Sequence, residues 1–312
     1  MAKAPLVRIG SRGSPLALAQ AEMVRARLSA AWPELGIRGA IAIEVIRTTG
    51  DRITDRPLAD AGGKGLFTKE IEDALLAGSI DLAVHSMKDM PTVFPDGLDV
   101  PCFLQREDPR DALIGKVGRI ADLPPGALVG TSSLRRKAQL LARRRDLKVV
   151  DLRGNVDTRL RKCERGDVQA TILALAGLRR LGIEHKAAAV IETTEMLPAV
   201  AQGAIGLEIR TADLRMREFL KPLHHAPTGI AVTAERAVLE RLDGSCRTPI
   251  AALAVGRTFG RLRLDALVAR PDGSKMIRTA REGAEADALE MGHDAGEELR
   301  REAGPGFFDS LR

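Results

Sequence analysis

The stretch "LVRIGSRGSPLALAQ", residues 6–20, shows the pattern that decides the fold of this chain. It opens with a short apolar run typical of a buried strand. Ser14 followed by Pro15 is a strong helix start, with Ser14 as N-cap and Pro15 in the first turn, and a helix is expected from about Pro15 to Ala31. A strand that leads directly into a helix is the repeating element of α/β domains.

Apolar runs and helical patterns continue to alternate. In the first hundred residues the further runs are "IAIEVIRT" (41–48) and "IDLAV" (80–84), with a helix at about Thr68 to Ala77. A second cycle has apolar runs at 127–133, 147–154 and 170–177 and helices at about 134–145 and 156–164. This alternation predicts two α/β domains of similar size, each with a mostly parallel sheet covered by helices.

From about Thr228 the pattern changes. A helical run, "GIAVTAERAVLERL" (229–242), leads to a turn that contains Cys246. Alternating segments at 261–270 and 275–281, joined by "PDGS", then predict an antiparallel hairpin. An amphipathic helix at about Ala286 to Glu302 completes a small α+β domain.

Cysteine and histidine usage argues against disulfides and metal sites. Cys102, Cys163 and Cys246 lie far apart, in no CxxC or Cys/His spacing, and the five histidines form no HExxH motif. No apolar h-region follows Lys3, and no segment has eighteen apolar residues in a row. We therefore expect a soluble, cytoplasmic protein without a metal.

The net charge of +6, from 48 basic and 42 acidic residues, predicts an anionic partner. Nucleic acid is one candidate class. Proteins that bind single strands or RNA usually stack bases on aromatic rings, yet this chain has no Tyr, one Trp and seven Phe. A small polycarboxylate or phosphate ligand therefore fits the composition better than nucleic acid.

Arginines recur at three places where a helix begins or a strand ends. They are Arg12 before the Ser14 cap, Arg135 and Arg136 after the hydroxyl run Thr131, Ser132 and Ser133, and Arg153 and Arg159 around the Gly154-Asn155 turn. A cation near a helix N-terminus opposes the helix dipole by ~0.3–1 kcal/mol, which favours an anion bound between them. Ligands of open α/β sheets bind at strand carboxyl ends, so we expect one basic cleft between the two domains. Solvated surface arginines are the alternative at each place.

The stretch "DLAVHSMKDMP" (81–91) places polar residues after a buried strand. They are His85, Ser86, Lys88 and Asp89, and Pro91 stops any helix. Ser86 and Asp89 have the spacing of a capping box, although no helical pattern follows, and Asp89 could instead form a structural ion pair. In a cleft, this carboxylate could accept N–H donors or stabilise a cationic intermediate.

Two further motifs contain small residues beside a reactive one. "AGGKGLF" (61–67) lacks the GxxxxGK[ST] phosphate-loop pattern, so we interpret it as a glycine-rich lid that carries Lys64. "RLDGSCRTP" (241–249) places Cys246 beside Arg247. A small buried hydrophobic residue is the ordinary fate of an isolated cysteine. The electropositive turn, without a histidine in the motif, fits a thiol that carries a group covalently better than one that turns over as a nucleophile.

Six stretches, in their order and spacing, resemble the porphobilinogen deaminase family. They are "VRIGSRGSPLALAQ" (7–20), "GGKGLFTKEIE" (62–72), "DLAVHSMKDMP" (81–91), "GTSSLRRKAQL" (130–140), "LRGNVDTRL" (152–160) and "GSC" (244–246). The resemblance runs from about Val7 to the final helix. It implies an enzyme of tetrapyrrole and haem biosynthesis that deaminates porphobilinogen, couples four molecules head to tail and releases hydroxymethylbilane. A dipyrromethane cofactor, attached to Cys246 through a thioether, would prime the chain.

The resemblance also assigns residues to roles. Asp89 matches the catalytic carboxylate, which would accept pyrrole N–H bonds and stabilise the azafulvenium cation left when ammonia departs. The residues implied to contact the cofactor are Ser14, Lys64, Ser86, Lys88, Asp89, Thr131, Ser133, Arg135, Arg136, Arg153, Gly154, Asn155 and Cys246. Those implied to contact the substrate carboxylates are Arg12, Ser14, Arg153, Arg159 and Arg180.

The fold implied by the resemblance is a monomer of three domains. Two are α/β domains of the type 2 periplasmic-binding-protein kind, at 1–104 plus 204–224 and at 105–203, with the chain crossing back to the first. The third, 225–312, is the small α+β domain. A two-lobed solute-binding or ligand-sensing module, without an attached cofactor, is the alternative function, and a nucleic-acid-binding protein is a third.

Overall fold

The computed structural model describes residues 4–52, 67–242 and 248–307. By its internal contacts the chain divides into two compact units. Unit 1 comprises Met1–Arg106 and Ala204–Gly229, and unit 2 comprises Glu107–Gly203 and Ile230–Arg312.

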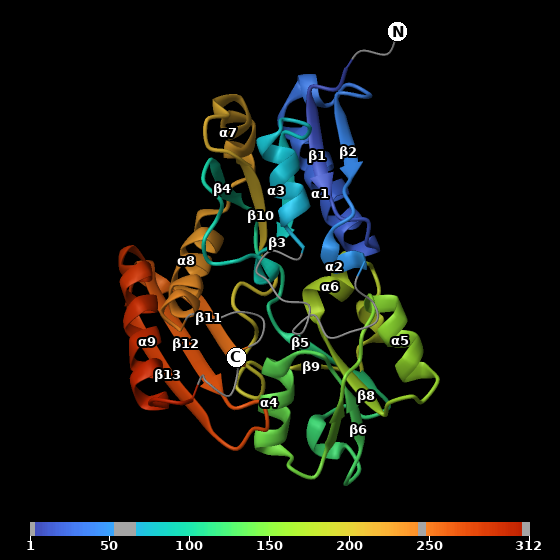
Figure 1. Ribbon diagram of the computed structural model, residues 1–312, viewed down its shortest axis with the longest axis vertical. Helices are drawn as coiled ribbons and strands as arrows, with labels where there is room; N and C mark the ends of the chain where they lie inside the picture. Colours follow the sequence, from blue (N-terminus) through green and yellow to red (C-terminus); the bar gives the residue numbers. More distant parts are fainter. Residues whose placement is uncertain (1–3, 53–66, 243–247, 308–312) are drawn as a thin grey trace. The chain divides into compact units, whose positions relative to one another are not determined.

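Unit 1 is built on a five-stranded mixed sheet of described residues with the order β2-β1-β3-β10-β4 (Figure 1). Its strands are β1 (Val7–Ser11), β2 (Ile41–Val45), β3 (Leu82–Ser86), β4 (Leu98–Phe103) and β10 (Ile205–Arg210). Strands β1, β2 and β3 are parallel, and β10 lies antiparallel between β3 and β4. The helices are α1 (Pro15–Ala31), α2 (Thr49–Arg52), α3 (Lys69–Leu76) and α7 (Leu214–Leu220).

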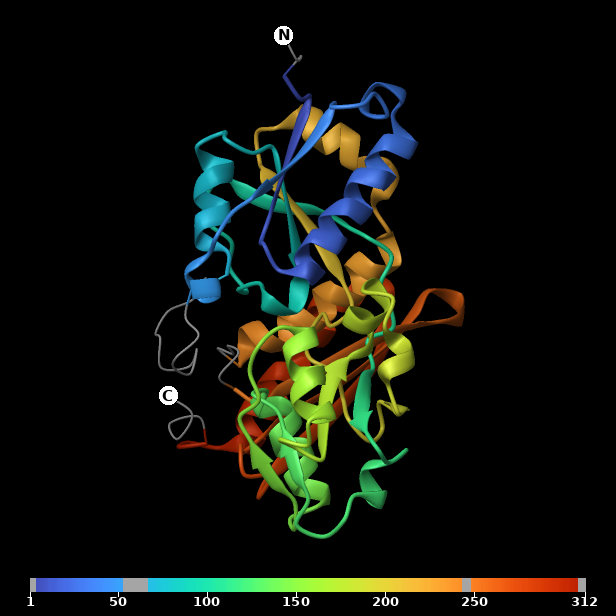
Figure 2. The same ribbon diagram turned by 90° about the vertical axis from the view of Figure 1, so that its right-hand side faces the viewer.

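Helices α1 and α3 cover opposite faces of this sheet, as Figure 2 shows. The alternation of side chains along a strand decides which residue meets which helix. Leu82 and Val84 of β3 pack in the cluster that contains Val24 and Leu28 of α1. Ala83, between them, packs instead with Ile71 and Leu75 of α3.

The first part of unit 2 is a second five-stranded mixed sheet of described residues, in the order β7-β6-β8-β5-β9. Its strands are β5 (Asp111–Gly115), β6 (Leu128–Gly130), β7 (Lys148–Val150), β8 (Ala170–Ala174) and β9 (Ala189–Ile191). Its helices are α4 (Leu134–Arg143), α5 (Val156–Glu164) and α6 (Leu175–Arg180). Leu140 of α4 packs on one face, and Leu160 of α5 and Leu178 of α6 pack on the other.

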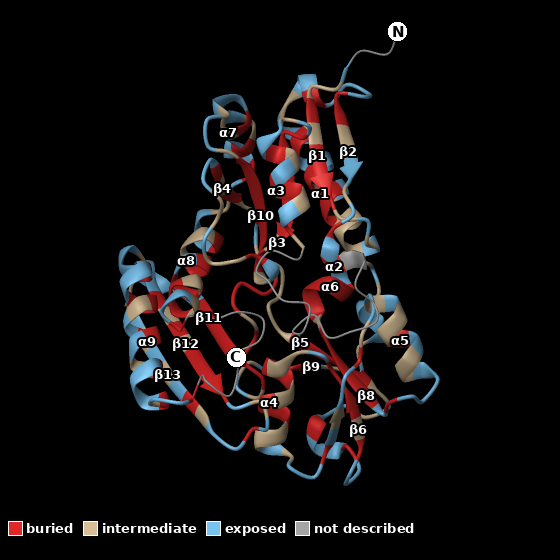
Figure 3. Ribbon diagram, in the orientation of Figure 1, coloured by how far each residue is buried: buried red, intermediate tan, exposed pale blue. Residues whose placement is uncertain are grey.

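The C-terminal part of unit 2 is an antiparallel sheet, β11-β12-β13, with helices. The elements are α8 (Ala226–Arg241), of which the residues up to Gly229 belong to unit 1, β11 (Ile250–Arg257), β12 (Arg261–Ala269), β13 (Met276–Ala284) and α9 (Ala288–Ala303). Leu253 and Leu267 pack with Ala138 of α4 and with Leu197. Figure 3 shows buried residues running along β8 and β12, with exposed residues on the outer side of α9.

The structure confirms the predicted fold class, two α/β sheets followed by a small antiparallel α+β part. The expectation that each sheet is mostly parallel is wrong, because β10 and β5 each pair antiparallel with both of their neighbours. Helices α1 and α5 have the predicted bounds, while α3 and α4 end before the predicted positions. The division into three domains at 1–104 plus 204–224, 105–203 and 225–312 stays a prediction. In the described ranges, no helix combines the length and apolar character that crossing a bilayer requires.

Candidate functional site

In unit 1, the predicted site residues lie where β1 and β3 end. Neighbouring parallel strands bring their carboxyl ends to the same sheet edge. Ser14 caps α1 by accepting a hydrogen bond from the Ala17 N–H at 3.2 Å. Ser86 is joined to this helix through Gln20, whose Nε2 donates to Ser86 Oγ at 3.0 Å. The guanidinium carbon of Arg12 lies 4.1 Å from the centroid of the Phe67 ring, a cation–π contact.

Lys88 and Asp89 belong to a single 3₁₀ turn, Met87–Asp89, directly after β3. Ser86 makes no side-chain cap hydrogen bond to this turn, so the capping-box alternative is wrong. Asp89 is exposed, and in the described part of the chain it forms no ion pair. The alternative of a structural ion pair at Asp89 therefore has no support among these residues. The carboxylate is available at a strand end, where a ligand can reach it.

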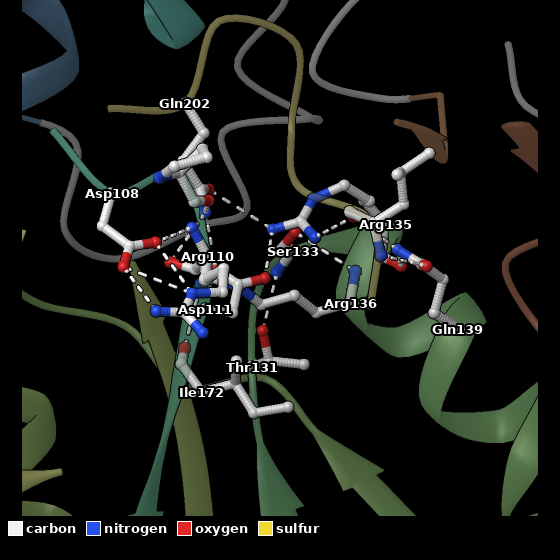
Figure 4. Close-up of polar contacts among 12 residues, drawn as sticks. Asp108, Arg110, Asp111, Thr131, Ser133, Arg135, Arg136, Gln139, Ile172 and Gln202 are labelled. Carbon is white, nitrogen blue, oxygen red and sulfur yellow. Dashed lines mark hydrogen bonds and ion pairs between the residues drawn. The ribbon is translucent and has the colours of Figure 1, made fainter. Parts of the chain in front are cut away.

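In unit 2, Arg135 and Arg136 reach from α4 to one buried carboxylate, that of Asp111 at the start of β5 (Figure 4). Arg135 Nη2 lies 2.8 Å from Asp111 Oδ2, and Arg136 Nη2 lies 2.8 Å from Asp111 Oδ1. The side chain of Asp111 is 0% exposed, and those of the two arginines 5% and 7%. Both arginines are thus internal, and the alternative of solvated surface cations is wrong for them.

Further hydrogen bonds hold this cluster in place. Gln202 Nε2 donates to Asp111 Oδ1 at 2.8 Å. Arg135 Nη1 donates to the Leu197 carbonyl at 2.7 Å, and Arg136 Nη1 donates to the Ile172 carbonyl at 2.9 Å. Burial by itself would raise the pKa of the Asp111 carboxyl, but the charges of Arg135 and Arg136 outweigh it and hold that pKa well below its ordinary value.

The cluster of Arg135, Arg136 and Asp111 carries more positive than negative charge, because two guanidinium groups face one carboxylate. The Nε atoms of both arginines are buried and have no hydrogen-bond partner among the described residues. A buried polar group without a partner is costly. The excess charge and the two N–H groups therefore fit an additional anion such as a carboxylate.

The hydroxyls before α4 act as the sequence predicts for a helix start. Ser133 is the N-cap and accepts a hydrogen bond from the Arg136 N–H at 3.4 Å. Thr131 Oγ1 accepts one from the Ser133 N–H at 3.2 Å. At the far end of α4, Arg143 donates to the carbonyls of Thr194 and Glu195 at 2.6 and 2.8 Å.

The turn after β7 holds the next group of predicted residues. Asn155 caps α5 by accepting a hydrogen bond from the Thr158 N–H at 2.9 Å. Gly154 has a φ of 114°, and a Cβ atom there would lie 2.6 Å from Thr158 Cγ2, so the turn requires glycine. Arg153 Nε donates to Asp151 Oδ2 at 2.6 Å, and Arg159 Nε donates to the Gly154 carbonyl at 2.9 Å.

Arg180 ends α6, where its Nη2 donates to the Gly203 carbonyl at 2.6 Å. Lys64 and Cys246 lie outside the described residues. Sequence reasoning missed Gln20, Asp111 and Gln202. The only local signal for Asp111 is an aspartate directly before the apolar run 112–114, which is too common a pattern to identify a partner for two arginines.

We expect Asp111→Asn to lower the free energy of unfolding by about 3–5 kcal/mol, because it leaves two buried guanidinium groups without a counter-ion. Since the pKa of Asp111 is lowered by folding, its stabilisation is present above the ordinary aspartate pKa. It is lost as the pH falls through the lower folded value. Chemical denaturation of variant and wild type at several pH values measures this difference.

Asp122→Asn is the control, because it removes a carboxylate from an exposed pair with Arg119 and should change stability little. An equally small effect of Asp111→Asn would contradict the internal role.

Two family models match the chain. Residues 7–218 match the model described as "Porphobilinogen deaminase, dipyromethane cofactor binding domain". Residues 230–301 match the model described as "Porphobilinogen deaminase, C-terminal domain".

Full-length relatives agree with these models. "Porphobilinogen deaminase, chloroplastic" of Oryza sativa subsp. japonica is 56% identical and covers 100% of this chain and 88% of its own length. "Porphobilinogen deaminase" of Paracoccus denitrificans (strain Pd 1222) is 57% identical and covers 97% of this chain and 96% of its own length. Among solved structures, a TRAP periplasmic solute binding protein from Desulfovibrio salexigens DSM2638 is 12% identical over 72% of this chain and 73% of its own. Its TM-score of 0.42 is too low to add to the assignment.

Proposed function

This chain belongs to the porphobilinogen deaminase family, and from that membership we propose which of its residues carry the family's chemistry. The enzyme has porphobilinogen deaminase activity in tetrapyrrole biosynthesis and takes a dipyrromethane cofactor. We propose that Cys246 holds the cofactor through a thioether and that four substrate molecules are joined to it head to tail. Tethering the acceptor makes each coupling effectively intramolecular, worth up to ~7–11 kcal/mol where the alignment is good.

The observation that carries the proposal is the cluster of Arg135, Arg136 and Asp111. Its excess positive charge and its two Nε–H groups without partners fit the carboxylate side chains of a dipyrromethane. The hydroxyls of Thr131 and Ser133 lie at the start of the same helix and would add donors beside the guanidinium groups. We propose that these four residues of unit 2 bind cofactor carboxylates.

In unit 1, we propose that Asp89 is the catalytic carboxylate. Its exposed side chain at the end of β3 can accept the pyrrole N–H of a substrate ring, which orients that ring. As ammonia departs, positive charge develops on the ring, and the nearby carboxylate stabilises it. The bound cofactor supplies the pyrrole carbon to which the first substrate is joined. Ser14, Ser86 and Lys88, at the same sheet edge, would contact the cofactor, as would Lys64.

The remaining arginines would bind the acetate and propionate groups of porphobilinogen. Arg153 Nε donates to Asp151, Arg159 Nε to the Gly154 carbonyl and Arg180 Nη2 to the Gly203 carbonyl, and Arg12 stacks on Phe67. The planar guanidinium, with its five N–H donors, suits these side chains to bind a carboxylate. Gly154 and Asn155 would contact the cofactor at the turn that positions Arg153.

We expect Arg136→Leu to lower turnover about 10- to 100-fold, because a hydrogen bond to a charged group is worth about 1.5–3 kcal/mol. The variant should also reduce the fraction of protein that carries cofactor. Arg135→Leu should behave in the same way. Intact mass measures loading, and thermal unfolding shows whether each variant is folded. Arg143→Leu is the matched control, because Arg143 lies on the same helix but binds only backbone carbonyls. A folded Arg136→Leu protein with full cofactor loading and full turnover would show that Arg136 has a purely structural role.

We further propose a cytoplasmic monomer, as the resemblance implies. A solute-binding or sensing module would share the arginines but carry no covalent cofactor. The mass of the purified protein therefore separates these two functions. A nucleic-acid-binding function would instead appear as strong, salt-dependent retention of DNA or RNA.

A further inference from the structure

Three ionisable side chains are buried directly behind the turn that carries Lys88 and Asp89. They are His85 at the end of β3, Glu208 of β10 and Glu72 of α3, with exposures of 6%, 0% and 7%. His85 Nε2 lies 2.8 Å from Glu208 Oε2. The reaction described above gives none of these groups a task.

Strand alternation explains why the three residues meet. Ala83 of β3 packs on α3, so His85, two residues further on, faces the same helix. On β10, Leu207 and Ile209 pack on the α1 side, so Glu208 between them also faces α3. The opposite orientation of Ser86 is confirmed by its hydrogen bonds with Gln20 of α1.

The same two strands hold the turn. The Met87 N–H donates to the Ala204 carbonyl at 3.1 Å, and Ile205 and Gly206 of β10 pair with Ser86 and His85. A Cβ atom at position 206 would collide with the Met87 sulfur, so glycine lets the turn pack closely on β10. The His85–Glu208 contact therefore joins the strand that carries the turn to the strand on which the turn packs.

Two buried carboxyl groups share this cluster with a single histidine. Burial raises the pKa of Glu72, and the negative charge of Glu208 raises it further. Glu72 Oε1 and Glu208 Oε1 are buried without a hydrogen-bond partner in the described ranges. Two buried carboxylates beside one histidine would leave a net negative charge in the core, which is costly. A neutral Glu72 beside the hydrogen-bonded His85–Glu208 pair lowers that cost.

Among the residues that the structure describes, no other charged group that faces this end of α3 supplies a counter-ion. Asp73, the next residue on α3, is exposed and itself raises the pKa of Glu72, and Glu70 accepts hydrogen bonds from Thr49. The charged residues of the neighbouring strands are paired elsewhere: Arg8 and Arg210 with Asp81, and Asp99 with Arg217.

We propose that His85, Glu208 and Glu72 are positioning residues, in which the hydrogen-bonded His85–Glu208 pair fixes the Met87–Asp89 turn and Glu72 is held as a neutral acid. This inference rests on the proposed role of Asp89 in the reaction. The pair acts through the turn and does not touch substrate. Its loss should therefore change the rate of the chemical step more than the binding of substrate.

The first test is Glu208→Gln, which keeps size and shape but removes the charge that faces His85. We expect kcat to fall about 10- to 100-fold, because a small misplacement of a catalytic group has an effect of this size. KM should stay within about twofold, and cofactor loading, measured by intact mass, should be unchanged. Asp73→Asn is the matched control, an exposed carboxylate on the neighbouring helix position, and should behave as wild type. A Glu208→Gln enzyme with normal kcat, or with kcat and KM altered together, would overturn the proposal.

The second test addresses Glu72 and does not depend on the reaction. A carboxyl whose pKa is raised by folding contributes stability below its ordinary pKa and loses it as the pH rises through the folded value. Glu72→Gln should therefore raise the melting temperature above that of wild type at pH values above the folded pKa of Glu72, with the difference shrinking as the pH falls toward the ordinary glutamate pKa. A difference in melting temperature that is the same at every pH would show that Glu72 is not a neutral acid.

The double variant links the two tests. In Glu208→Gln, Glu72 is the one carboxylate left beside His85 and can ionise to pair with it. Adding Glu72→Gln to that background should lower kcat by a larger factor than Glu72→Gln does in the wild type. Strictly additive effects would overturn the shared-charge arrangement. If Asp89→Asn left turnover normal, the role of the turn would fail, while the melting curves of Glu72→Gln would still report on Glu72.

Discussion

Protein with Cys246→Ala is expected to have the mass of the polypeptide alone and no measurable turnover. The wild type should be heavier than its sequence by one dipyrromethane. Without the thiol, the growing chain has no covalent attachment, and each coupling loses the advantage of an intramolecular reaction, up to ~7–11 kcal/mol. Intact mass spectrometry of freshly purified wild type and variant, with an activity assay, measures both effects.

The other two cysteines provide the control. Burial raises the pKa of the Cys102 thiol to about 12. Burial also raises the pKa of Cys163, and the neighbouring Glu164 adds to this effect. Thiols held in the protonated form are poor nucleophiles, so Cys163→Ala should keep the cofactor mass and the activity. An active wild type whose mass equals the bare polypeptide would refute the tether.

Asp89→Asn is expected to load cofactor normally, and its turnover should be lower than that of wild type by a factor of about 10²–10³. A carboxylate about 4 Å from a developing positive charge stabilises it by on the order of 4 kcal/mol at an effective dielectric of about 20. Asparagine can still accept a pyrrole N–H but supplies no negative charge. Single-turnover and steady-state rates of the loaded variant separate slow chemistry from weak binding.

The matched control for this variant is Asp96→Asn, which removes another exposed carboxylate of unit 1. Its turnover should equal that of wild type, because net charge alone does not stabilise the reacting ring. Near-normal turnover of Asp89→Asn would mean that this carboxylate has no catalytic role. Loss of cofactor loading together with turnover would instead place Asp89 in cofactor assembly.

Local features of the fold could be predicted from the sequence because they depend on neighbouring residues. A cap was expected at Ser14 and at one of the hydroxyls of residues 131–133, and Asn155 was expected in a turn just before a helix. Ser14, Ser133 and Asn155 each accept a hydrogen bond from an N–H three residues later. The alternation of apolar runs and helices correctly predicted two α/β sheets and the C-terminal hairpin, but not the antiparallel pairing of strands β4, β5, β9 and β10. The position of Asp89 after a buried strand also follows from the local pattern. The roles assigned to these residues stay predictions.

Pairings between distant segments could not be predicted in this way. The sequence pattern contains no signal that β10 enters the first sheet antiparallel between β3 and β4. It also does not show that Arg135 and Arg136 share Asp111, more than twenty residues earlier in the chain. From the sequence, both arginines were interpreted as anion ligands at a helix N-terminus, and an internal carboxylate was not considered.

By itself, the sequence determined several helix starts, the class of the fold and, through its motifs, the family. Only the tertiary structure decided which charges are buried together: two arginines around Asp111, and Glu72 beside His85 and Glu208. The physical reason is that a helix cap is completed within one turn of chain. A charge removed from water needs a counter-charge nearby in space, and which residue supplies it depends on how the sheets are assembled.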